Sequence, residues 1–358
     1  MSDAASVKVE VDINGKPVDE SDFLAYTVDR DMFQPDMAQI VLSNQGDKYT
    51  TTAKIGDAVE IKIGDDGTSI YKGEIVGVEP IYKGGEKTRV VLRAMNKLHR
   101  LLRVRKSITF TDKTDSDILS QVVGDSGLSL KWQHQTSIQY KHVYQHNQTN
   151  LEFLRTRAAR MGCHVWCVDQ TVYVQQPVLQ GAPSKTLTVD KPGDGETALR
   201  EFRPLLSSAS IVKKVTVKGW NPETKELITG QAEAQKSSLG DENAATGAGP
   251  LAGEETFTVD HPIWSAEEAK ALATARLQDL SLTYITGVAV CTGDPGFDIG
   301  KLVKITANAD DDSNKNDDPF NGNYYVMGLT HRHDASKSKD GGYSTTLRVA
   351  RDAQKMSS

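Results

Sequence analysis

The sequence predicts a mainly β protein of the α+β class, in which two similar antiparallel β-barrel modules flank a small α/β middle domain. Three observations lead to this prediction. One short motif occurs near both ends of the chain, apolar and polar residues alternate in both outer thirds, and helix starts are marked between them. A chain of 358 residues can hold about two to three domains. We place the first module at 1–107, the middle domain with returning strands at 108–205, and the second module at 206–358.

The repeated motif reads I-G-x-x-V-x-I and stands at Ile55–Ile61 and again at Ile299–Ile305. The echo continues downstream, where Tyr71-Lys72-Gly73 is matched by Phe320-Asn321-Gly322 and Leu92-Arg93 by Leu347-Arg348. The repeat therefore predicts four structurally equivalent glycines, with Gly56 on Gly300 and Gly73 on Gly322. The second copy is longer, and we place its extra residues in the polar stretches 310–318 and 336–342, because duplicated modules tolerate insertions in loops.

Strict alternation marks the strands of the first module. Val7–Ile13 places apolar residues on one face and charged residues on the other, and Asn14-Gly15 is a typical hairpin turn. The same reasoning predicts strands at 23–29, 38–42, 58–63, 70–78 and 89–94.

Three helices are predicted from capping boxes, in which a hydroxyl and a later carboxylate satisfy free backbone N–H groups. The pairs are Thr114 with Asp117, Thr149 with Glu152, and Ser265 with Glu268. The first two helices belong to the middle domain and the third to the second module.

The β pattern of the middle domain and the second module is less regular. We expect strands at 164–168, 171–175, 215–217, 227–232, 285–291, 302–306, 324–329 and 344–350. Residues 236–253 are rich in Ser, Gly, Ala and Asn with few large apolar side chains, so we predict a mobile loop there.

Composition excludes several classes of protein. The net charge of −6 does not favour nucleic-acid binding, and no run of 18 apolar residues predicts a membrane span. The polar residues 1–6 do not resemble a secretory signal. Three cysteines are an odd count in a large chain, which indicates synthesis in a reducing compartment rather than a disulfide scaffold.

The middle of the chain resembles a known family of hub proteins. The order Thr109-Phe110-Thr111, Thr114, Gly127-Leu128, Tyr144, Thr149 to Arg155, then Met161-Gly162-Cys163 resembles baseplate hub proteins of contractile phage tails, of the late-control D type. It is also similar to the N-terminal hub region of VgrG-type spikes. His331 and His333, followed by Gly342 to Leu347, resemble the family's final hairpin.

The resemblance implies a homotrimer whose six barrels form a ring between a hexameric tail tube and a trimeric spike. A separate spike protein, tail-tube or tube-initiator proteins and other baseplate proteins are the implied partners. Because the sequence lacks the C-terminal oligosaccharide-binding domain and β-helical needle that full VgrG-type spikes carry, we expect the spike to be a separate protein. The implied location is a phage-tail-like particle assembled in the bacterial cytoplasm.

Two candidate metal sites are weak. Cys163 and Cys167 share one face of a predicted strand from which His164 points away, and no second Cys/His pair exists for zinc, so a buried apolar strand is favoured. The acidic run 310–318 lacks the Gly and Glu that an EF-hand calcium loop needs, which favours a solvated loop. We therefore expect neither metal nor cofactor.

A basic run includes Arg100, Arg103 and Arg105, separated by apolar residues. It fits either an amphipathic turn with a solvated face or a contact with another subunit, since interfaces favour Arg.

The sequence shows no nucleophile elbow, phosphate loop or zincin helix, so we expect no catalytic residues and no enzyme activity. The predicted function is that of a structural hub of a contractile injection machine. The alternatives are a tail-associated cell-wall hydrolase and a carbohydrate-binding β-module, although the four Trp residues are scattered along the chain.

Overall fold

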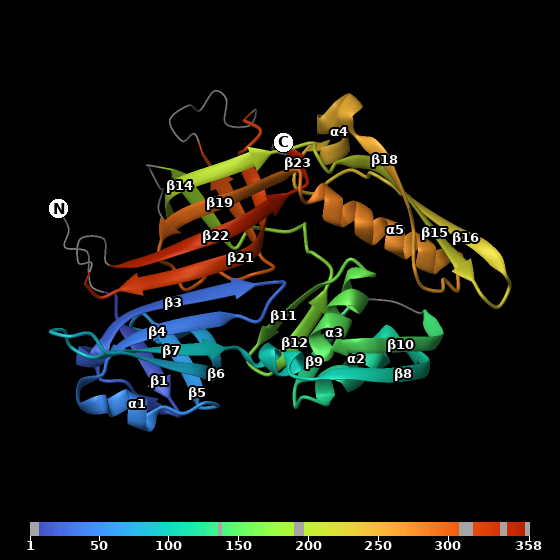
Figure 1. Ribbon diagram of the computed structural model, residues 1–358. Coiled ribbons are helices and arrows are strands. Elements are labelled where there is room, and N and C mark those ends of the chain that lie inside the picture. Colours follow the sequence, from blue (N-terminus) through green and yellow to red (C-terminus); the bar gives the residue numbers. More distant parts are fainter. Residues whose placement is uncertain (1–6, 135–137, 190–196, 308–317, 337–341, 355–358) are drawn as a thin grey trace.

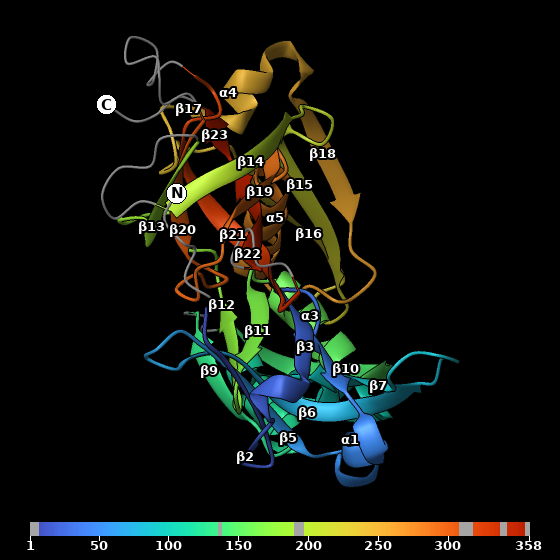
Figure 2. The same ribbon diagram turned by 90° about the vertical axis from the view of Figure 1, so that its left-hand side faces the viewer.

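The computed structural model describes residues 7–134, 138–189, 197–307, 318–336 and 342–354. The chain is mostly β and contains one closed six-stranded barrel. Four parts are stacked in two tiers (Figures 1 and 2): a first sheet unit and the middle domain lie in one tier, and the second barrel and a helix–sheet layer lie in the other. Each part has its own cluster of buried apolar side chains.

The first sheet unit has six main strands that curl around an apolar core containing Tyr26, Ile40 and Ile61. Their order is β1 (Val9–Ile13), β5 (Ala58–Ile63), β6 (Thr68–Ile81), β7 (Arg89–Met95), β4 (Met37–Ser43) and β3 (Phe23–Asp31). Short elements complete the unit: β2 (Lys16–Pro17), η1 (Glu20–Asp22), η2 (Gln45–Asp47) and α1 (Lys48–Thr52). Within the described residues no pairing joins β1 to β3, so hydrogen bonds do not close this sheet into a barrel.

The second module forms the closed barrel, which keeps the name second barrel below. It is closed because β21 pairs with both β20 and β22, and β13 pairs with both β14 and β20. Its strands, in order, are β13 (Lys185–Val189), β14 (Thr197–Leu206), β19 (Ile285–Thr292), β22 (Tyr343–Arg351), β21 (Gly322–Asp334) and β20 (Leu302–Thr306). The predicted boundary between 205 and 206 is wrong, because β13 and β14 complete this barrel. Only the pairing partners, which are distant in sequence, decide where these strands belong.

Five strands of each half share one order and one direction. The antiparallel series β3-β4-β7-β6-β5 corresponds to β14-β19-β22-β21-β20. Bulges interrupt both ladders at corresponding places, between Phe23 and Ala25 in β3 and between Leu199 and Glu201 in β14. The sixth strand differs, since β1 runs antiparallel to β5 whereas β13 runs parallel to β20.

The ladders correct one pair of predicted equivalent glycines. Gly56 and Gly300 do correspond: both have positive φ, and their N–H groups donate to Ile75 O at 2.8 Å and Val326 O at 2.9 Å. The second pair is wrong. Val59 lies opposite Gly73, whereas its counterpart Val303 lies opposite Tyr324.

The glycines that do correspond downstream are Gly77 and Gly328. Each follows a bulge and lies opposite an arginine, Arg93 or Arg348. The spacing of short aromatic-x-Gly motifs could not reveal this register, because the side-chain period of two leaves a two-residue slip on the same face. The polar loops chosen for the insertions, 310–318 and 336–342, lie almost entirely outside the described residues.

The middle domain packs two helices on short sheets around a core that includes Leu119, Leu154 and Val172. Both predicted capping boxes are present: the hydroxyls of Thr114 and Thr149 accept hydrogen bonds from the N–H groups of Asp117 and Glu152 at 3.2 Å. Its elements are η3 (Lys97–Leu102), β8 (Arg105–Thr114), α2 (Asp115–Gly124), β9 (Ser129–Gln133), β10 (Gln139–Thr149), α3 (Asn150–Ala159), β11 (His164–Val168) and β12 (Thr171–Gln175).

The helix–sheet layer consists of one sheet and the third predicted helix. Strands β15 (Val212–Asn221), β16 (Glu226–Glu233) and β18 (Gly253–Thr258) form the sheet, and α5 (Ala266–Ser281) packs on it. A Cβ added to Gly230 would lie 2.2 Å from the carbonyl carbon of Ala269, so glycine permits the close approach of helix and strand.

The prediction of a mobile loop at 236–253 is wrong. This stretch contains β17 (Glu242–Asn243), α4 (Ala244–Ala248) and η4 (Gly249–Leu251), and β17 pairs with β23 (Ala353–Gln354). Leu239 and Ala244 are buried in the core of the second barrel. The small residues reflect close packing rather than mobility, since a Cβ on Gly247 would lie 2.1 Å from the Tyr284 hydroxyl.

Replacing Leu154 by Asp should unfold the middle domain. The side chain of Leu154 is fully buried in α3, and an unpaired carboxylate there costs several kcal/mol or must be protonated. Thermal melting of Leu154→Asp should show a large loss of stability, whereas Thr156→Asp, exposed on the same helix, should melt within a few degrees of the unsubstituted chain. Equal melting temperatures for all three proteins would contradict this account of the helix.

Deleting residues 238–249 should destabilise the second barrel. The deletion removes buried Leu239, whose truncation alone would cost about 2–5 kcal/mol. It also removes the Leu239 carbonyl that accepts a hydrogen bond from buried Arg351 Nη2 at 2.9 Å. Urea unfolding should show the loss, and a deletion variant as stable as the parent chain would contradict the packed arrangement seen here.

Candidate assembly surfaces

One ladder joins the two halves of the chain. Strand β3 pairs with the outer half of β21 over seven residue pairs, from Asp31 with Gly328 to Ala25 with Asp334. We call this ladder the joint. Because of the joint, the first sheet unit and the second barrel form one 13-stranded sheet (Figure 1). Val28 and His331 lie opposite each other in it, and both are fully buried.

Ion pairs lie on both faces of the joint, those of Arg348 on the accessible face and those of Arg30 on the buried face. Arg348 Nη2 lies 2.6 Å from Asp31 Oδ2, and its Nη1 lies 3.4 Å from Asp29 Oδ1. Arg30 Nη2 lies 2.9 Å from Asp298 Oδ1 and its Nε lies 3.3 Å from Asp36 Oδ2. Burial raises the pKa of Asp36 to about 6, and the attraction of Arg30 opposes that effect. The alternation of Asp29, Arg30 and Asp31 in an otherwise apolar strand was the signal in the sequence that could have indicated this contact.

His331 is held inside the joint as a neutral group. Its Nδ1 lies 3.1 Å from Thr345 Oγ1 and 3.0 Å from the Tyr343 hydroxyl. Burial, and secondarily the charge of Arg30, lower the pKa of His331 to about 3. The predicted final hairpin therefore contributes a buried structural histidine and not an exposed binding group.

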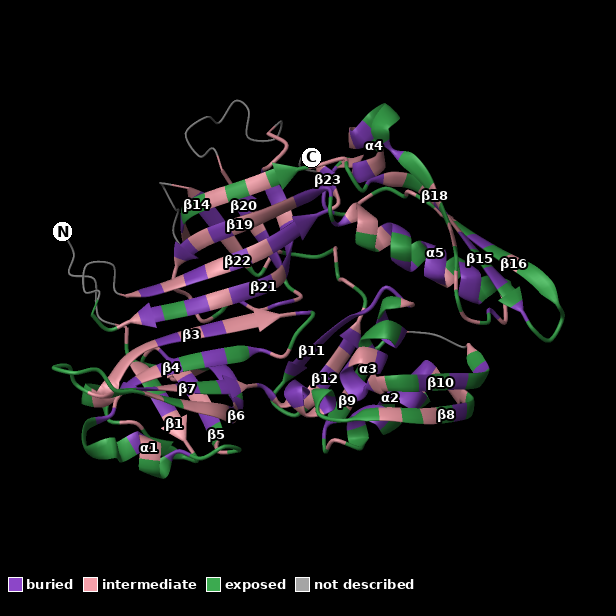
Figure 3. Ribbon diagram, viewed as in Figure 1, coloured by how far each residue is buried: buried purple, intermediate pink, exposed green. Residues whose placement is uncertain are grey.

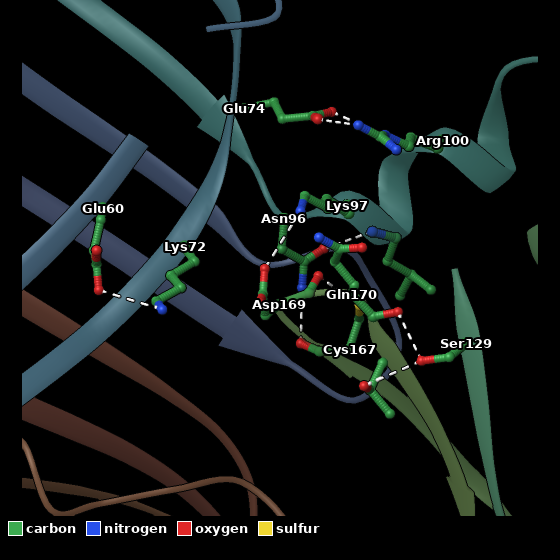
Figure 4. Close-up of polar contacts among 12 residues, drawn as sticks. Glu60, Lys72, Glu74, Asn96, Lys97, Arg100, Ser129, Cys167, Asp169 and Gln170 are labelled. Atoms are coloured by element: carbon green, nitrogen blue, oxygen red, sulfur yellow. Dashed lines mark hydrogen bonds and ion pairs between the residues drawn. The ribbon is translucent and has the colours of Figure 1, made fainter. Parts of the chain in front are cut away.

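A second contact fastens the first sheet unit to the middle domain (Figure 4). Asn96 accepts a hydrogen bond from the Leu98 N–H and donates from Nδ2 to Cys167 O, both at 3.2 Å. Lys97 Nζ lies 3.4 Å from Asp169 Oδ1. Asn96 therefore caps η3 and holds the end of β11 at the same time.

The basic run is used within the chain. Arg100 forms an ion pair with Glu74, which also contacts His99 Nε2 at 3.0 Å (Figure 4). Arg103 Nη2 lies 3.4 Å from the other ring nitrogen of His99. Arg105 lies apart and contacts Glu152 at 2.9 Å in α3. Arg100 and Arg103 thus surround one histidine at the contact with the middle domain.

Strand β11 separates two cores. Cys163, Val165 and Cys167 face the middle domain, while Trp166 faces the second barrel, and His164 Nδ1 lies 3.1 Å from the Tyr325 hydroxyl. Burial raises the pKa of both thiols to about 12. The two cysteines therefore occupy a buried apolar face, as the alternation predicts.

Among the described residues no group of three or more His, Cys, Asp and Glu side chains is arranged to hold a metal ion. Residues 310–317 of the acidic run lie outside the described residues. The described helices include none that is long and apolar enough to cross a membrane.

A cleft of about 720 Å³ lies where the second barrel, the middle domain and the end of α5 meet. Its lining is mainly apolar and includes Phe33, Leu205, Leu282, Val288 and Met327. Of the four Asp and Arg side chains in the lining, Asp31 and Arg348 pair with each other. The other two are Arg203 and Asp279, and burial raises the pKa of Asp279 to about 6. The cleft therefore offers mainly apolar contact area.

The fold is that of phage tail proteins. The chain superposes on the tail protein of Neisseria meningitidis with a TM-score of 0.72 at 15% sequence identity, covering 97% of each chain. It superposes on the 43 kDa tail protein of prophage MuSo2 from Shewanella oneidensis with a TM-score of 0.70 at 14% identity, covering 97% of this chain and 99% of that one.

A third similar structure comes from a secretion machine. It is a component of the type VI secretion system of E. coli, with a TM-score of 0.59 at 11% identity over 97% of this chain and 79% of that one. That protein is described as similar in structure to the bacteriophage T4 tail proteins gp27 and gp5.

Sequence comparison places the chain in a family. Residues 3–334 match the family described as Alg8 N-terminal domain, and the chain belongs to that family. No match was found among the curated proteins.

Replacing His331 by Gln should change how stability depends on pH. The folded pKa of about 3 lies below the ordinary value of 6.5, so stability from neutral His331 is present above pH 6.5 and is lost as the pH falls toward 3. Between pH 7 and 4.5 this loss amounts to about 2.5 kcal/mol in the unsubstituted chain and is absent in His331→Gln.

The measurement is urea unfolding at both pH values. The stability gap between the unsubstituted chain and His331→Gln should shrink at pH 4.5. His142→Gln, at an exposed position of β10, controls for the substitution itself. A gap that stays constant with pH would contradict the buried neutral histidine.

Proposed function

We propose that this protein is the structural hub of a contractile injection machine baseplate. Three copies would form a ring of six β units that adapts a hexameric tail tube to a trimeric spike. The observation that supports the proposal most is the internal correspondence: two five-stranded series with the same order, direction and bulge positions, joined edge to edge in one chain. Three chains with two such units each offer six similar positions for a tube with sixfold symmetry.

The similar structures favour this role and its partners. Two are tail proteins, and one belongs to a type VI secretion system. A further similar structure is a PdpA–VgrG complex of Francisella, with a TM-score of 0.55 at 9% identity. The match covers 99% of this chain and 60% of the chain in that complex. A separate spike, tail-tube or tube-initiator proteins and other baseplate proteins are the proposed partners. The proposed location is a phage-tail-like particle assembled in the bacterial cytoplasm.

The proposed role is mechanical and not enzymatic, without a cofactor and without specific binding of nucleic acid. Phe33, Tyr82, Tyr144 and Trp220 are exposed, and the ring contacts of Phe33 and Tyr144 are with His164 and His146 and not with one another, which does not favour the carbohydrate-binding alternative. We propose three functional parts: the first sheet unit up to about residue 95, the middle domain from 97 to 175, and the remainder with the second barrel and the helix–sheet layer. In the ring, Arg100 and, through His99, Arg103 would support the contact of the first two parts, and Arg105 would hold β8 to α3 within the middle domain.

The purified chain should assemble as a trimer. Multi-angle light scattering should give three times the chain mass of 39.1 kDa, and particle images should show threefold or pseudo-sixfold views. The buried interface should exceed roughly 2,000 Å², as is typical of obligate assemblies. A ring of six copies, or a peripheral monomer in the particle, would contradict the adaptor role. Lysis of peptidoglycan by the purified chain would instead favour the alternative of a cell-wall hydrolase.

A further inference from the structure

The two strands that correspond to those of the joint each have an edge that pairs with no described strand. The correspondence of ladders makes β14 the counterpart of β3, and β6 the counterpart of β21. In the joint, Ala25–Asp31 of β3 pair with Gly328–Asp334 of β21. The counterparts are residues 201–207 and residues 77–83. In the part of the chain that the structure describes, no strand pairs with the open side of Glu201–Leu206 or of Gly77–Ile81.

The counterpart positions follow from the ladders and not from sequence similarity. Asp29 and Leu205 correspond because they lie opposite Met37 and Thr286, which in turn lie opposite Met95 and Ala350. Thr330 and Glu79 correspond in the same way, because each follows the bulge glycine by two residues, Gly328 or Gly77.

Both open edges expose apolar side chains that the joint would bury. On the face that the joint buries, Tyr82 is 66% and Leu206 is 37% exposed, whereas their counterparts in the joint, His333 and the side chain of Arg30, are 7% and 12% exposed. Exposed residues, green in Figure 3, lie along β14. Leu205 and Ile81 lie on the opposite face, where their counterparts in the joint also remain accessible. Phe202 and Pro204 of β14 are partly exposed, whereas the residues at the corresponding positions of the joint, Tyr26 and Val28, are 1% and 0% exposed. Side chains on these open edges are therefore more exposed than their counterparts in the joint, as expected if a strand of another chain covers them.

We propose that β14 of one copy pairs with β6 of the next copy, in the register of the joint. This inference rests on the proposed function and names the surfaces that connect the subunits. The occupant of each open edge is a second copy of this chain, because the complementary edge occurs in the same chain and continues an interface already present. Each copy offers one edge of each kind, so the contacts run head to tail and can close into a ring.

The proposed contact between copies differs from the joint at one pair of opposite residues. In the joint, Met32 N–H donates to Met327 O and Ala335 N–H donates to Leu24 O, which makes Val28 and His331 a hydrogen-bonded pair. The corresponding residues are Pro204 and Pro80, and neither has an N–H to donate. Both edges are thereby protected from pairing with unrelated strands, and the contact relies more on its apolar side chains.

The register predicts a cross-strand neighbour for each side chain. In the joint, Thr330 Oγ1 donates to Asp29 Oδ1 at 2.8 Å across a pair that is not hydrogen-bonded through the backbone. The corresponding pair between copies is Glu79 with Leu205. Such pairs have Cα atoms about 4.5 Å apart, which lies within the range that a disulfide can bridge.

The test is disulfide formation between copies of the full chain carrying Glu79→Cys and Leu205→Cys. The native Cys163, Cys167 and Cys291 are buried, so they leave the introduced pair free to react alone. Mild oxidation should give a covalent trimer as the main species on a non-reducing gel. The matched control combines Leu205→Cys with Tyr82→Cys, which places the second thiol three residues, about 10 Å, out of register and should cross-link far less.

Each outcome bears on the proposal. A covalent trimer from the in-register pair alone supports the pairing of β14 with β6. A trimer by light scattering that does not cross-link, or that cross-links equally in the control, overturns this contact and leaves the proposed hub function standing. A chain that neither cross-links nor forms trimers, alone or in its particle, overturns both.

Discussion

The pairing of β3 with β21 is the contact on which the rest of the structure depends. It joins strands about 300 residues apart in sequence, so its ordering cost must be met by interactions made only in the folded chain. A continuous ladder, the buried pair Val28 and His331, and the ion pairs of Arg348 and Arg30 supply them. Because backbone hydrogen bonds fix both spacing and direction, the two halves are held in one orientation.

The middle domain supports this arrangement from the side. Its helices are held by capping boxes that need only local sequence, but its position is set by contacts made elsewhere. Asn96 donates a hydrogen bond to the end of β11, and on the face of β11 away from the middle-domain core His164 and Trp166 contact the second barrel. One strand with two buried faces thus couples three parts of the molecule.

The internal repeat shows which equivalent positions short sequence motifs can predict and which they cannot. Gly56 and Gly300 could be matched from sequence, because each needs the positive φ that few residues other than glycine adopt. Gly73 and Gly322 could not, because a glycine within a strand serves whatever lies beside it. Gly73 makes room for Tyr71 and the Met95 carbonyl, and Gly322 for the Arg351 guanidinium. The matching pair, Gly77 and Gly328, became visible only through the bulges that precede them.

The sequence by itself determined the local elements of this protein: the strands that alternate, the three capped helices, the buried face of Cys163 and Cys167, and the mainly β class. These follow from periodicity and capping, which act over a few residues. The tertiary structure alone decided that β13 and β14 close the second barrel and that the Leu239 carbonyl accepts a hydrogen bond from Arg351. It also decided that, within the described residues, the second half of β14 and of β6 each keeps one open edge. Those outcomes depend on which distant strands meet, and a strand's own residues specify a face to bury but not the partner that covers it.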